Sequence, residues 1–476
     1  MVMKTFSLQG VFKDYSYWLK KNWYYHSYCA ALYKFIIPPH RRVLQIQCKS
    51  GYLLNAVQPS YGVGIDIDSE AISHAQQHYP LHRFLNQSLS DLASDKPFDY
   101  IIISGALMET DDIQNFLRLL KNHTHARSRI VVDFYSTLWE PLLTVATWLK
   151  FRQPTLLKNW VSVYDMKNFF YLAGFETITT GKQFLFPYAI PLLSWFLNTL
   201  VATIPFLNNL CLMQWLVARP AGVDQDPLSL SVSVIITCKN ERGNIRAAVQ
   251  RCPLMGKSTE LIFVEGGSSD GTLEEIKNVI ATHSRSDIQI RHFVQSGKGK
   301  GDAVRIGFAA AQGDILMILD GDLTTPPEEL PKFFDALVQG KGDFINGSRL
   351  VYGMESEAMR FLNLIANYLF GIGFTWLLGQ RIKDTLCGTK VLFKHDYEKI
   401  AEQRAFFGNF DPFGDFDLIF GAAKQQLKIV EMPVHYKNRT YGTTQISRFT
   451  HGMLLLRMSF FAFRRFKCRS LPGKEK

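Results

Sequence analysis

Short apolar runs alternate with longer mixed segments along most of the chain, a pattern typical of α/β folds. The runs that we expect to form strands span residues 42–46, 62–66, 98–103 and 129–133, and then 231–237, 260–264 and 315–319. Parallel strands that are buried on both faces read as continuous apolar runs of this kind. The pattern therefore predicts an α/β fold with a doubly wound sheet in each half of the chain.

A chain of 476 residues is too long for one ordinary core, so we expect two Rossmann-like domains. A linker is expected at 221–229, where Gly, Asp and Pro gather. The other expected parts are a helical lead-in at 1–40, a first domain at 41–220, a second domain at 230–450 and an amphipathic basic tail at 451–476.

The tract 183–218 contains no Asp, Glu, Lys, Arg or His. It is long enough to cross a bilayer, but Pro187, Pro191 and Pro205 interrupt it. We expect an apolar helical tail that lies in a membrane interface or covers the first domain. The segments 363–378 and 451–462 could form a second interfacial platform, and ordinary core packing explains them nearly as well.

The net charge of +11 suits nucleic acid, an anionic membrane surface or phosphorylated substrates as partners. Arginine-rich recognition helices and zinc-finger spacings are missing, so nucleic acid is not expected. The seven cysteines show no C-x-x-C spacing, which favours a reducing compartment without structural zinc. The first residues lack the continuous apolar core of a signal peptide. We therefore expect a cytoplasmic protein, peripheral on the inner face of the cell membrane.

Two carboxylates, Asp320 and Asp322, follow the apolar run 315–319 with one glycine between them. Ligands of open α/β sheets bind beyond the carboxyl ends of the strands, so these acids stand where a ligand would lie. Hard oxygen ligands suit Mg²⁺ or Mn²⁺ held together with substrate phosphates. An isolated Asp-x-Asp is more often a polar turn, so its neighbours must decide between the two interpretations.

The neighbouring strands also end in polar turns. Asn240-Glu241 follows the first strand of this half, and the acid, glycine and hydroxyl turn 265–272 follows the second. The sequence Gly-Lys-Gly-Lys-Gly at 297–301 offers bare amides and two positive charges near a helix start. Such a segment is suited to bind an anion.

The first half resembles class I S-adenosylmethionine-dependent methyltransferases. Their acid-x-Gly-x-Gly-x-Gly motif aligns with 45–51, where Gln45, Gln47 and Lys49 replace the acid and two glycines and Gly51 remains. Asp66 matches the acid that binds the cofactor ribose. The resemblance implies a methyltransferase-like fold, with Gly51 and Asp66 as residues that bind S-adenosylmethionine. A bulky Lys49 would hinder the usual approach of the cofactor, so both an active methyltransferase and a degenerate scaffold stay open.

The second half resembles family 2 inverting glycosyltransferases of the GT-A fold, and most of all the polyprenyl-phosphate sugar synthases, of which dolichyl-phosphate mannosyltransferase is typical. The segments that carry this resemblance, over about residues 230–450, are 240–241, 265–272, 297–301, 320–323, 346–349, 384–389 and 428–434. The whole chain resembles bifunctional bacterial proteins that fuse a methyltransferase-like half to such a transferase. Glu265-Gly266 stands where many relatives have two aspartates, which we interpret as an altered donor preference.

The resemblance implies roles for individual residues. Thr237, Glu241 and Glu265 would hold the donor nucleoside, and Lys298 would lie near its ribose or phosphates. Asp320 and Asp322 would anchor Mg²⁺ or Mn²⁺ on the diphosphate of a UDP- or GDP-sugar. The residues implied to contact acceptor or diphosphate anions are Arg349, Lys390 and Arg439, the last on a loop at 439–444 that closes over the donor.

The sequence Phe413-Gly414-Asp415-Phe416-Asp417 supplies candidates for a catalytic base. We favour Asp415, with Asp417 as the alternative. A strand would place both acids on one side, whereas a helix would separate them by about 200°. An acid pair at a helix N-terminus, without a catalytic role, is the other interpretation.

The favoured function is a metal-dependent glycosyltransferase that moves a sugar to a lipid-linked (polyprenyl phosphate) or glycan acceptor of the cell envelope. One alternative is an active methyltransferase that modifies a glycan, with the second domain as a substrate-binding module. Another is a non-catalytic binding protein of glycan assembly.

Overall fold

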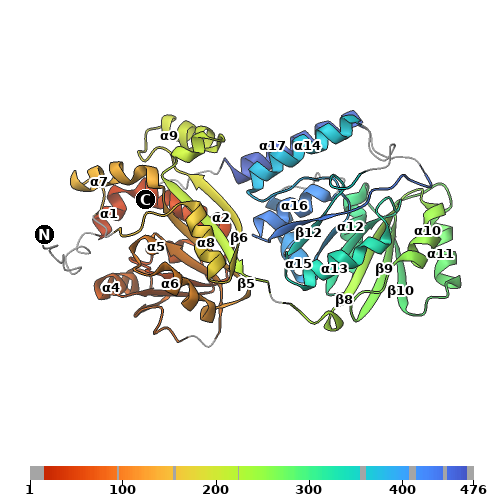
Figure 1. Ribbon diagram of the computed structural model, residues 1–476, viewed down its shortest axis with the longest axis horizontal. Helices are drawn as coiled ribbons and strands as arrows, with labels where there is room; N and C mark the ends of the chain where they lie inside the picture. Colours follow the sequence, from red (N-terminus) through yellow and green to blue (C-terminus); the bar gives the residue numbers. More distant parts are fainter. Residues whose placement is uncertain are drawn as a thin grey trace. The chain divides into compact units, whose positions relative to one another are not determined.

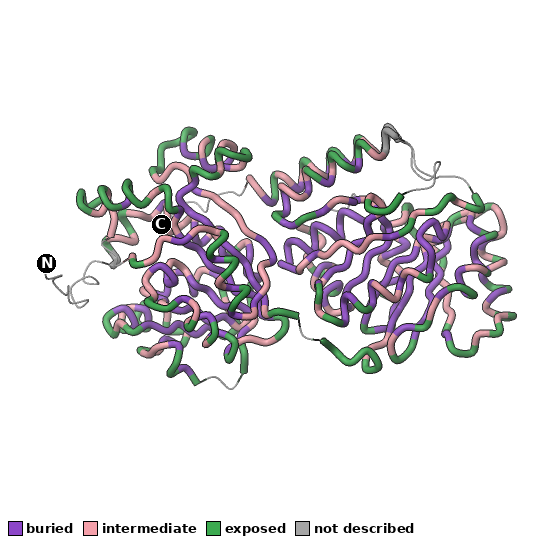
Figure 2. Tube along the Cα trace, in the orientation of Figure 1, coloured by how far each residue is buried: buried purple, intermediate pink, exposed green. Residues whose placement is uncertain are grey.

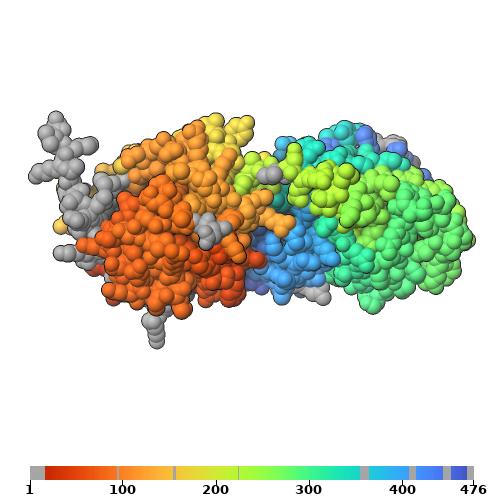
Figure 3. All heavy atoms as spheres, turned by 90° about the horizontal axis from the view of Figure 1, so that it is seen from below, coloured from red at the N-terminus to blue at the C-terminus, as the bar shows by residue number. Residues whose placement is uncertain are grey.

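The structure is a computed structural model that describes residues 15–93, 96–153, 157–222, 224–353, 361–406, 414–442 and 448–468. The chain divides into two units between Ala221 and Gly222, and the second unit ends at Phe466 (Figure 1). In the space-filling view the colours of the first unit run from red to yellow and those of the second from green to blue (Figure 3). Of the predicted features, residues 1–14, Phe413, 443–444 and 469–476 lie outside the described residues.

The first unit is built on a seven-stranded sheet with the order β3-β2-β1-β4-β5-β7-β6. Its strands are β1 (Arg42–Ile46), β2 (Tyr61–Asp66), β3 (Arg83–Asn86), β4 (Phe98–Ser104), β5 (Thr124–Tyr135), β6 (Phe175–Gln183) and β7 (Met213–Pro220). Strands β1 to β5 are mutually parallel, and β7 is antiparallel to both β5 and β6. The predicted doubly wound sheet is confirmed.

Helices cover both faces of this sheet. The helices are α1 (Tyr15–Lys21), α2 (Trp23–Ile36), α3 (Tyr52–Ala56), α4 (Ser69–His78), α5 (Ala106–Glu109), α6 (Ile113–Leu120), α7 (Glu140–Trp148), α8 (Val163–Leu172) and α9 (Leu193–Trp195). Adjacent strand residues point to opposite faces, so Val43 packs with Tyr33 and Ile36 of α2, while Leu44 packs with Leu117 of α6. The sheets are the buried centre of each unit (Figure 2).

The apolar tract 183–218 is not one helical tail. It holds Phe184, which is buried, then α9 and short helical turns between Phe196 and Leu210, and its last residues enter strand β7. Residues 213–218 are apolar because β7 lies between β5 and β6 inside the sheet. Asn198 is buried and donates a hydrogen bond of 3.0 Å to the Tyr24 hydroxyl of α2. Within the described parts of the chain, no helix is long and apolar enough to span a membrane.

The second unit has its own seven-stranded sheet, in the order β10-β9-β8-β11-β13-β12-β14. Its strands are β8 (Ser231–Cys238), β9 (Ser258–Glu265), β10 (Ile288–Val294), β11 (Ile315–Asp320), β12 (Phe344–Ser348), β13 (Lys390–Phe393) and β14 (Ile429–Pro433). Strands β10, β9, β8 and β11 are parallel, and β13 is antiparallel to its two neighbours. The strand order reverses between β8 and β11, which places a ligand crevice at their carboxyl ends.

The helices of the second unit are α10 (Arg242–Arg251), α11 (Thr272–Thr282), α12 (Lys300–Ala310), α13 (Leu330–Val338), α14 (Phe361–Leu378), α15 (Lys394–Glu402), α16 (Asp415–Lys424) and α17 (Arg448–Phe466). Helices α14 and α17 run side by side, where the rings of Trp376 and Phe463 stack at 5.7 Å (Figure 1). Phe374 of α14 packs on Phe416 and Phe420 of α16, which fixes this pair on the unit.

Candidate active site

Three parallel strands bring predicted site residues together at one edge of the second sheet. In register, Thr237 of β8 pairs with Asp320 of β11 and with Val264 of β9, and the next residue, Cys238, pairs with Glu265. Thr237, Glu265 and Asp320 therefore end adjacent strands on the side where parallel sheets bind ligands.

The turns after β8 and β9 are held to each other by hydrogen bonds. The backbone amide of Asn240 donates to Ser268 Oγ at 2.9 Å, and that of Ser269 donates to Asn240 Oδ1 at 2.9 Å. The amide of Glu241 donates to Thr272 Oγ1 at 3.0 Å. Asn240 has a φ of 55°, a left-handed conformation that Asn tolerates better than most residues. The two predicted nucleoside-binding turns thus form one preorganised wall.

Asp320 is paired with a lysine of the glycine-lysine segment. Lys300, the first residue of α12, places its Nζ 2.5 Å from Asp320 Oδ1. Burial tends to raise the pKa of Asp320, but Lys300 outweighs it and holds that pKa below its usual value. Gly388 packs over this pair, because a Cβ at that position would lie 2.1 Å from Asp320 Oδ2.

Asp322 is fixed by hydrogen bonds and by an arginine. Its Oδ1 accepts from the backbone amide of Thr324 at 3.1 Å and from Thr324 Oγ1 at 2.8 Å. Its Oδ2 lies 2.6 Å from Arg439 Nη2. The same guanidinium reaches Glu241, with Nη1 3.3 Å from Oε1. Arg439 therefore bridges two of the predicted donor-binding acids.

Glu241 is a buried carboxylate with a displaced pKa. Burial raises its pKa to about 7, although Arg439 and a 2.7 Å hydrogen bond from Asn244 Nδ2 act against that rise. The negative charge of Asp322 adds to this rise of the pKa.

Asp415 and Asp417 lie in the first turn of a helix, α16, so the helical alternative of the sequence analysis holds. They contact different cations. Asp415 Oδ1 is 2.7 Å from the fully buried Lys390 Nζ, while Asp417 Oδ2 is 3.0 Å from Arg404 Nε. Burial raises the pKa of Asp417, with Arg404 opposing the rise.

The start of α16 closes on the start of α12. Gly414 has a φ of 76°, and a Cβ there would lie 2.9 Å from the Cα of Gly301. Asp415 is consequently close enough to Lys300 to help raise the pKa of that lysine above its usual value, against the effect of burial. Asp415 thus lies on the side of the metal-binding candidates, and Asp417 lies away from them.

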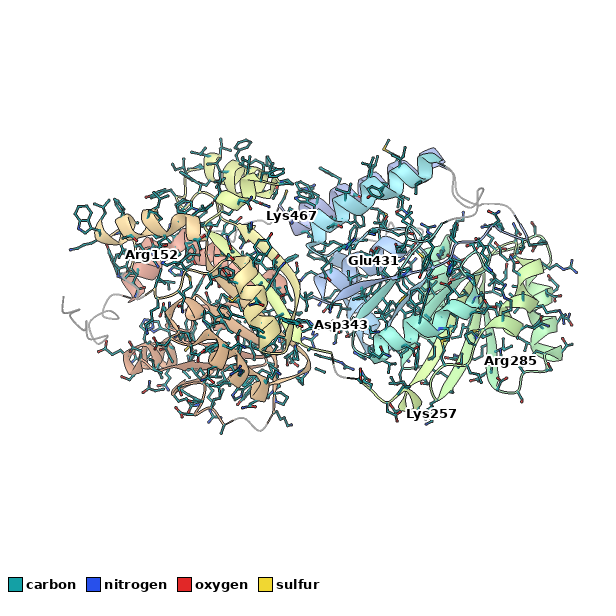
Figure 4. All side chains as sticks on the ribbon, in the orientation of Figure 1. Arg152, Lys257, Arg285, Asp343, Glu431 and Lys467 are labelled. Atoms are coloured by element: carbon teal, nitrogen blue, oxygen red, sulfur yellow. The ribbon has the colours of Figure 1, made fainter. Side chains whose placement is uncertain are left out.

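Arg349 is engaged in a buried bidentate ion pair. Its Nε and Nη2 lie 2.8 Å from Oδ2 and Oδ1 of Asp384, and Asn367 Nδ2 donates to the same carboxylate at 2.8 Å. Glu431 of β14, labelled in Figure 4, accepts the amides of Lys383 and Asp384. These contacts position the segment 384–389, which carries Gly388, so Arg349 acts on the site through that segment.

Lys298, the predicted phosphate contact, is exposed, whereas Lys300 makes the contact with Asp320. Which lysine of the segment 297–301 points inward depends on where α12 begins. Lys300, Asn244 and Asp384 are the residues that sequence reasoning did not single out. The position of Lys300 at the start of a predicted helix was the feature of the sequence that could have indicated its role.

The carboxylates of Asp320 and Asp322 fit a hard divalent ion. Among the described residues, no group of three or more His, Cys, Asp or Glu side chains could hold a metal by itself. Mg²⁺ and Mn²⁺ sites that are shared with substrate phosphates need only one or two protein carboxylates, so this donor set is sufficient.

The first unit places Gly51 and Asp66 at its own strand ends. Gly51, with a φ of 74°, precedes α3, and a Cβ there would lie 2.6 Å from the Phe84 ring. Asp66 ends β2 and accepts the backbone amides of Lys49 at 2.9 Å and Asp68 at 3.1 Å. Burial raises the pKa of Asp66 despite these bonds. Both residues have structural partners within the unit.

S-adenosylmethionine does not fit these residues well. Lys49 stands at a glycine position of the motif, with Nζ 3.4 Å from Glu109 Oε1 beyond the carboxyl end of β4. Burial and the positive charge of Lys49 lower the pKa of His26 to about 4. The Lys49 side chain thus stands where the motif has a glycine that lets the backbone approach the cofactor closely.

Parts of the chain are similar in sequence to known proteins. The family model of glycosyl transferase family 2 matches residues 233–407. The dolichol-phosphate mannosyltransferase of Pyrococcus furiosus is 31% identical over 222 residues, 46% of this chain and 59% of the relative. The undecaprenyl-phosphate 4-deoxy-4-formamido-L-arabinose transferase of Aeromonas hydrophila is 33% identical over 113 residues, 23% of this chain and 34% of the relative. The chain thus spans between a third and three fifths of the length of these relatives.

Two solved structures each match about half of the chain or less at low sequence identity. The Mycobacterium tuberculosis glucosyl-3-phosphoglycerate synthase, in complex with Mn²⁺ and UDP, is 19% identical, with a TM-score of 0.36, and covers 52% of this chain and 82% of that chain. The Haloferax volcanii complex between the Trm112 methyltransferase activator and the putative methyltransferase is 16% identical, with a TM-score of 0.33, and covers 43% and 92%. The segment 233–407 that matches the family model of glycosyl transferase family 2 lies within the second unit, and the first unit carries a separate α/β sheet.

Proposed function

We propose that the chain transfers a sugar from a nucleotide-sugar donor to a lipid-linked acceptor of the polyprenyl phosphate class at the inner face of the cell membrane. The observation that carries the proposal is the register of β8, β9 and β11, which sets Thr237, Glu265 and Asp320 side by side, with Asp322 two residues beyond the strand end. Two relatives named for transfer to undecaprenyl phosphate and dolichol phosphate support the class of acceptor.

The donor would lie with its nucleoside against the joined turns after β8 and β9 and with its diphosphate at Asp320 and Asp322. Mg²⁺ or Mn²⁺ at these two carboxylates would offset the charge that develops on the nucleotide leaving group. Lys300 and Arg439 balance the same carboxylates in the structure. In the donor complex, both cations would be available to the diphosphate, because a divalent ion then balances the acids.

The acceptor side is expected around Asp415. A phosphate acceptor is already an anion and needs little help from a base, whereas a sugar hydroxyl requires a carboxylate within hydrogen-bond reach. For a glycan acceptor, we assign this role to Asp415, which lies beside Lys300, in preference to Asp417, which pairs with Arg404.

A lipid-linked acceptor also needs a place for its chain. Helices α14 and α17 bury Phe374 and Leu455 against the unit and expose a set of apolar side chains: Ile365, Tyr368, Leu369, Ile372, Met453, Leu456 and Phe460. Arg464 and Arg465 follow in the last turn of α17. An apolar face beside positive charge is suited to peripheral contact with an anionic membrane.

For the first unit, we propose a scaffold role without S-adenosylmethionine. The ion pair of Lys49 with Glu109 and the loss of two motif glycines support this proposal.

The transfer reaction is tested with a panel of UDP- and GDP-sugars, Mn²⁺ and polyprenyl phosphate in detergent. We expect label to move to the lipid with one donor and the rate to fall by about a hundredfold or more in Asp320→Asn and Asp322→Asn. Asp314→Asn is the matched control, since Asp314 precedes the same strand and contacts Ser231 at its opposite end. Equal rates in all three variants would remove the basis for the proposal.

A further inference from the structure

The first unit carries an exposed apolar surface that its fold does not use. It consists of residues 138–149, which include α7, and of the segment 188–210, and we call it the α7–α9 surface. Its members are Leu138, Leu142, Val145, Trp148, Leu149, Tyr188, Ile190, Leu192, Trp195, Phe206 and Leu210. Trp148, Leu192 and Phe206 are 80%, 83% and 87% exposed, which is costly for side chains of this size in water.

Helix α7 is apolar on its outer side as well as its inner side. Leu143 is its one buried residue, and Leu142, Val145 and Trp148 are exposed at helical spacing. A helix of a water-exposed surface normally turns charged or polar side chains outward. The outer side of α7 therefore has the composition of a surface that contacts a binding partner. Figure 2 shows α7 as mostly exposed.

The two parts form one continuous surface. Trp139 Nε1, at the start of α7, donates a 2.8 Å hydrogen bond to the carbonyl oxygen of Leu210. Asn198 holds the segment on α2 through Tyr24, and Tyr28 donates to the Asn198 carbonyl at 3.1 Å. Figure 1 draws α7 and α9 along the same side of the first unit. The exposed side chains are thus presented by an anchored framework.

Two of the most exposed residues have a backbone conformation that L residues rarely adopt. Leu192 has a φ of 63° with a ψ of −49°, and Phe206 a φ of 72° with a ψ of −49°. At Leu192 the amide of Leu193 donates to the Pro191 carbonyl at 2.7 Å, which closes a strained three-residue turn. Glycine would adopt these angles at lower cost, yet both positions carry large apolar side chains that project outward.

The charge around the surface is mostly positive. Between residues 134 and 164 the sequence holds one acidic residue, Glu140, and between 177 and 222 it holds none. The basic residues at its edge are Lys21 and Lys182, with Lys150 and Arg152 just after α7 in the chain. Lys21 Nζ donates to the Lys150 carbonyl at 2.8 Å, and Lys182 hydrogen-bonds Asn209, so these cations are next to α7 and the segment 188–210. Arg152, labelled in Figure 4, lies just beyond α7.

We propose that the α7–α9 surface docks the first unit on an anionic phospholipid bilayer. Aromatic and aliphatic side chains would enter the interface, and the lysines would remain at the level of the phosphate headgroups. A protein partner would have to supply an acidic rim around an apolar centre, whereas an anionic membrane has both features by nature. This membrane contact is separate from the transfer reaction and gives the methyltransferase-like unit a function.

The test measures flotation of the full chain with vesicles of phosphatidylcholine alone and of phosphatidylcholine with phosphatidylglycerol, without donor or acceptor. We expect binding to the anionic vesicles and a loss of about tenfold or more in Trp148→Glu/Phe206→Glu. Leu81→Glu is the control, because Leu81 lies between α4 and β3 and is 93% exposed. Trp148→Ser/Phe206→Ser, which adds no charge, should show an intermediate loss.

The charge of the rim is tested separately. Lys21→Gln/Lys150→Gln should weaken binding to anionic vesicles by about fivefold for each lysine and leave binding to neutral vesicles unchanged. Transfer to a detergent-dispersed acceptor should keep its rate in all these variants, which separates this proposal from the proposed reaction. Unchanged vesicle binding in Trp148→Glu/Phe206→Glu would overturn the proposal. So would a change in the sedimentation of the chain with concentration, since the surface would then join two copies.

Discussion

Four acids around the donor edge of the second unit each contact a cation from another element. Lys300 of α12 neutralises Asp320, Arg439 neutralises Asp322 and reaches Glu241, and Lys390 of β13 neutralises Asp415. Buried or half-buried carboxylates that approach one another repel unless such partners are present. The same cations lie within reach of the place where a diphosphate would bind, so stability and function depend on the same side chains.

Replacing Lys300 should separate its role from that of Lys298. Lys300→Met leaves Asp320 without its partner, and we expect the free energy of unfolding to fall by about 1–3 kcal/mol. Transfer should also fall, by about tenfold or more, since a cation at the diphosphate is lost. Lys298→Met is the matched control and should change both quantities little, because Lys298 is exposed. Chemical denaturation and initial rates measure the two effects, and equal losses in both variants would contradict the assignment.

Glu241 gives a pH dependence of stability with a defined direction. Its pKa is about 7 in the folded chain and near the ordinary value of 4.5 when unfolded. The folded state therefore binds the extra proton between these values, and stability falls as the pH rises from 4.5 to 7. Glu241→Gln should remove this loss and raise the free energy of unfolding above pH 7 by about 1–3 kcal/mol. Unfolding curves from pH 4 to pH 8 test it, and a gain that persists at pH 4 would be inconsistent with this cause.

At the scale of elements, the site depends on how closely three segments meet. The start of α12 lies between the end of β11 and the start of α16, and the segment 384–389 covers it. The buried ion pair of Arg349 with Asp384 fixes that segment. The guanidinium of Arg349 is therefore engaged by a carboxylate of the protein itself. The geometry of the acids is thus a property of the packed segments.

Gly388 tests this packing. In Gly388→Ala the new Cβ would lie 2.1 Å from Asp320 Oδ2, so the segment must move away from the Asp320–Lys300 pair. We expect transfer to fall by about tenfold or more, because small displacements of catalytic groups are costly. Gly353→Ala is the control, since a Cβ there has no atom within 4 Å. Steady-state rates of both variants measure the effect. An unchanged rate in Gly388→Ala would show that the segment 384–389 can move without affecting the site, contrary to this expectation.

The strands of the site could be predicted from the sequence, because β8, β9 and β11 are continuous apolar runs that end in polar turns. Other features could not be. The last residues of the tract 183–218 have the composition of a buried helix or strand alike, and only pairing with β5 and β6 makes them β7. The Asp415-Phe416-Asp417 alternation fits a strand and a helix start equally. Likewise, the choice between Lys298 and Lys300 depends on the first residue of α12, and helix ends are poorly determined by local sequence.

At the scale of the whole molecule, the two units have the same class of fold, but the polar residues at their strand ends are arranged differently. The second unit keeps its strand-end acids facing a common edge. In the first unit, Lys49 pairs with Glu109, and Tyr33 donates a 2.6 Å hydrogen bond to the buried Asp133, so polar groups at the strand ends satisfy one another. Burial raises the pKa of Asp133 even with this bond.

The first unit should therefore not respond to S-adenosylmethionine. We expect no heat of binding and no rise in the thermal midpoint at millimolar cofactor, whereas a bound ligand would stabilise the chain. Lys49→Gly serves as the comparison, because it removes the ammonium and restores a motif glycine. Saturable binding by the unaltered chain in the micromolar range would contradict the scaffold role.

The central claim is that Asp320 and Asp322 hold a divalent ion on a nucleoside diphosphate. Calorimetric titration of the chain with UDP and GDP, with and without Mn²⁺, tests it most directly. We predict binding of one nucleotide that requires Mn²⁺, is retained in Asp314→Asn, and is weakened by about tenfold or more in Asp320→Asn and Asp322→Asn. Binding that is equally tight without Mn²⁺, or equally tight in Asp322→Asn, would contradict the account.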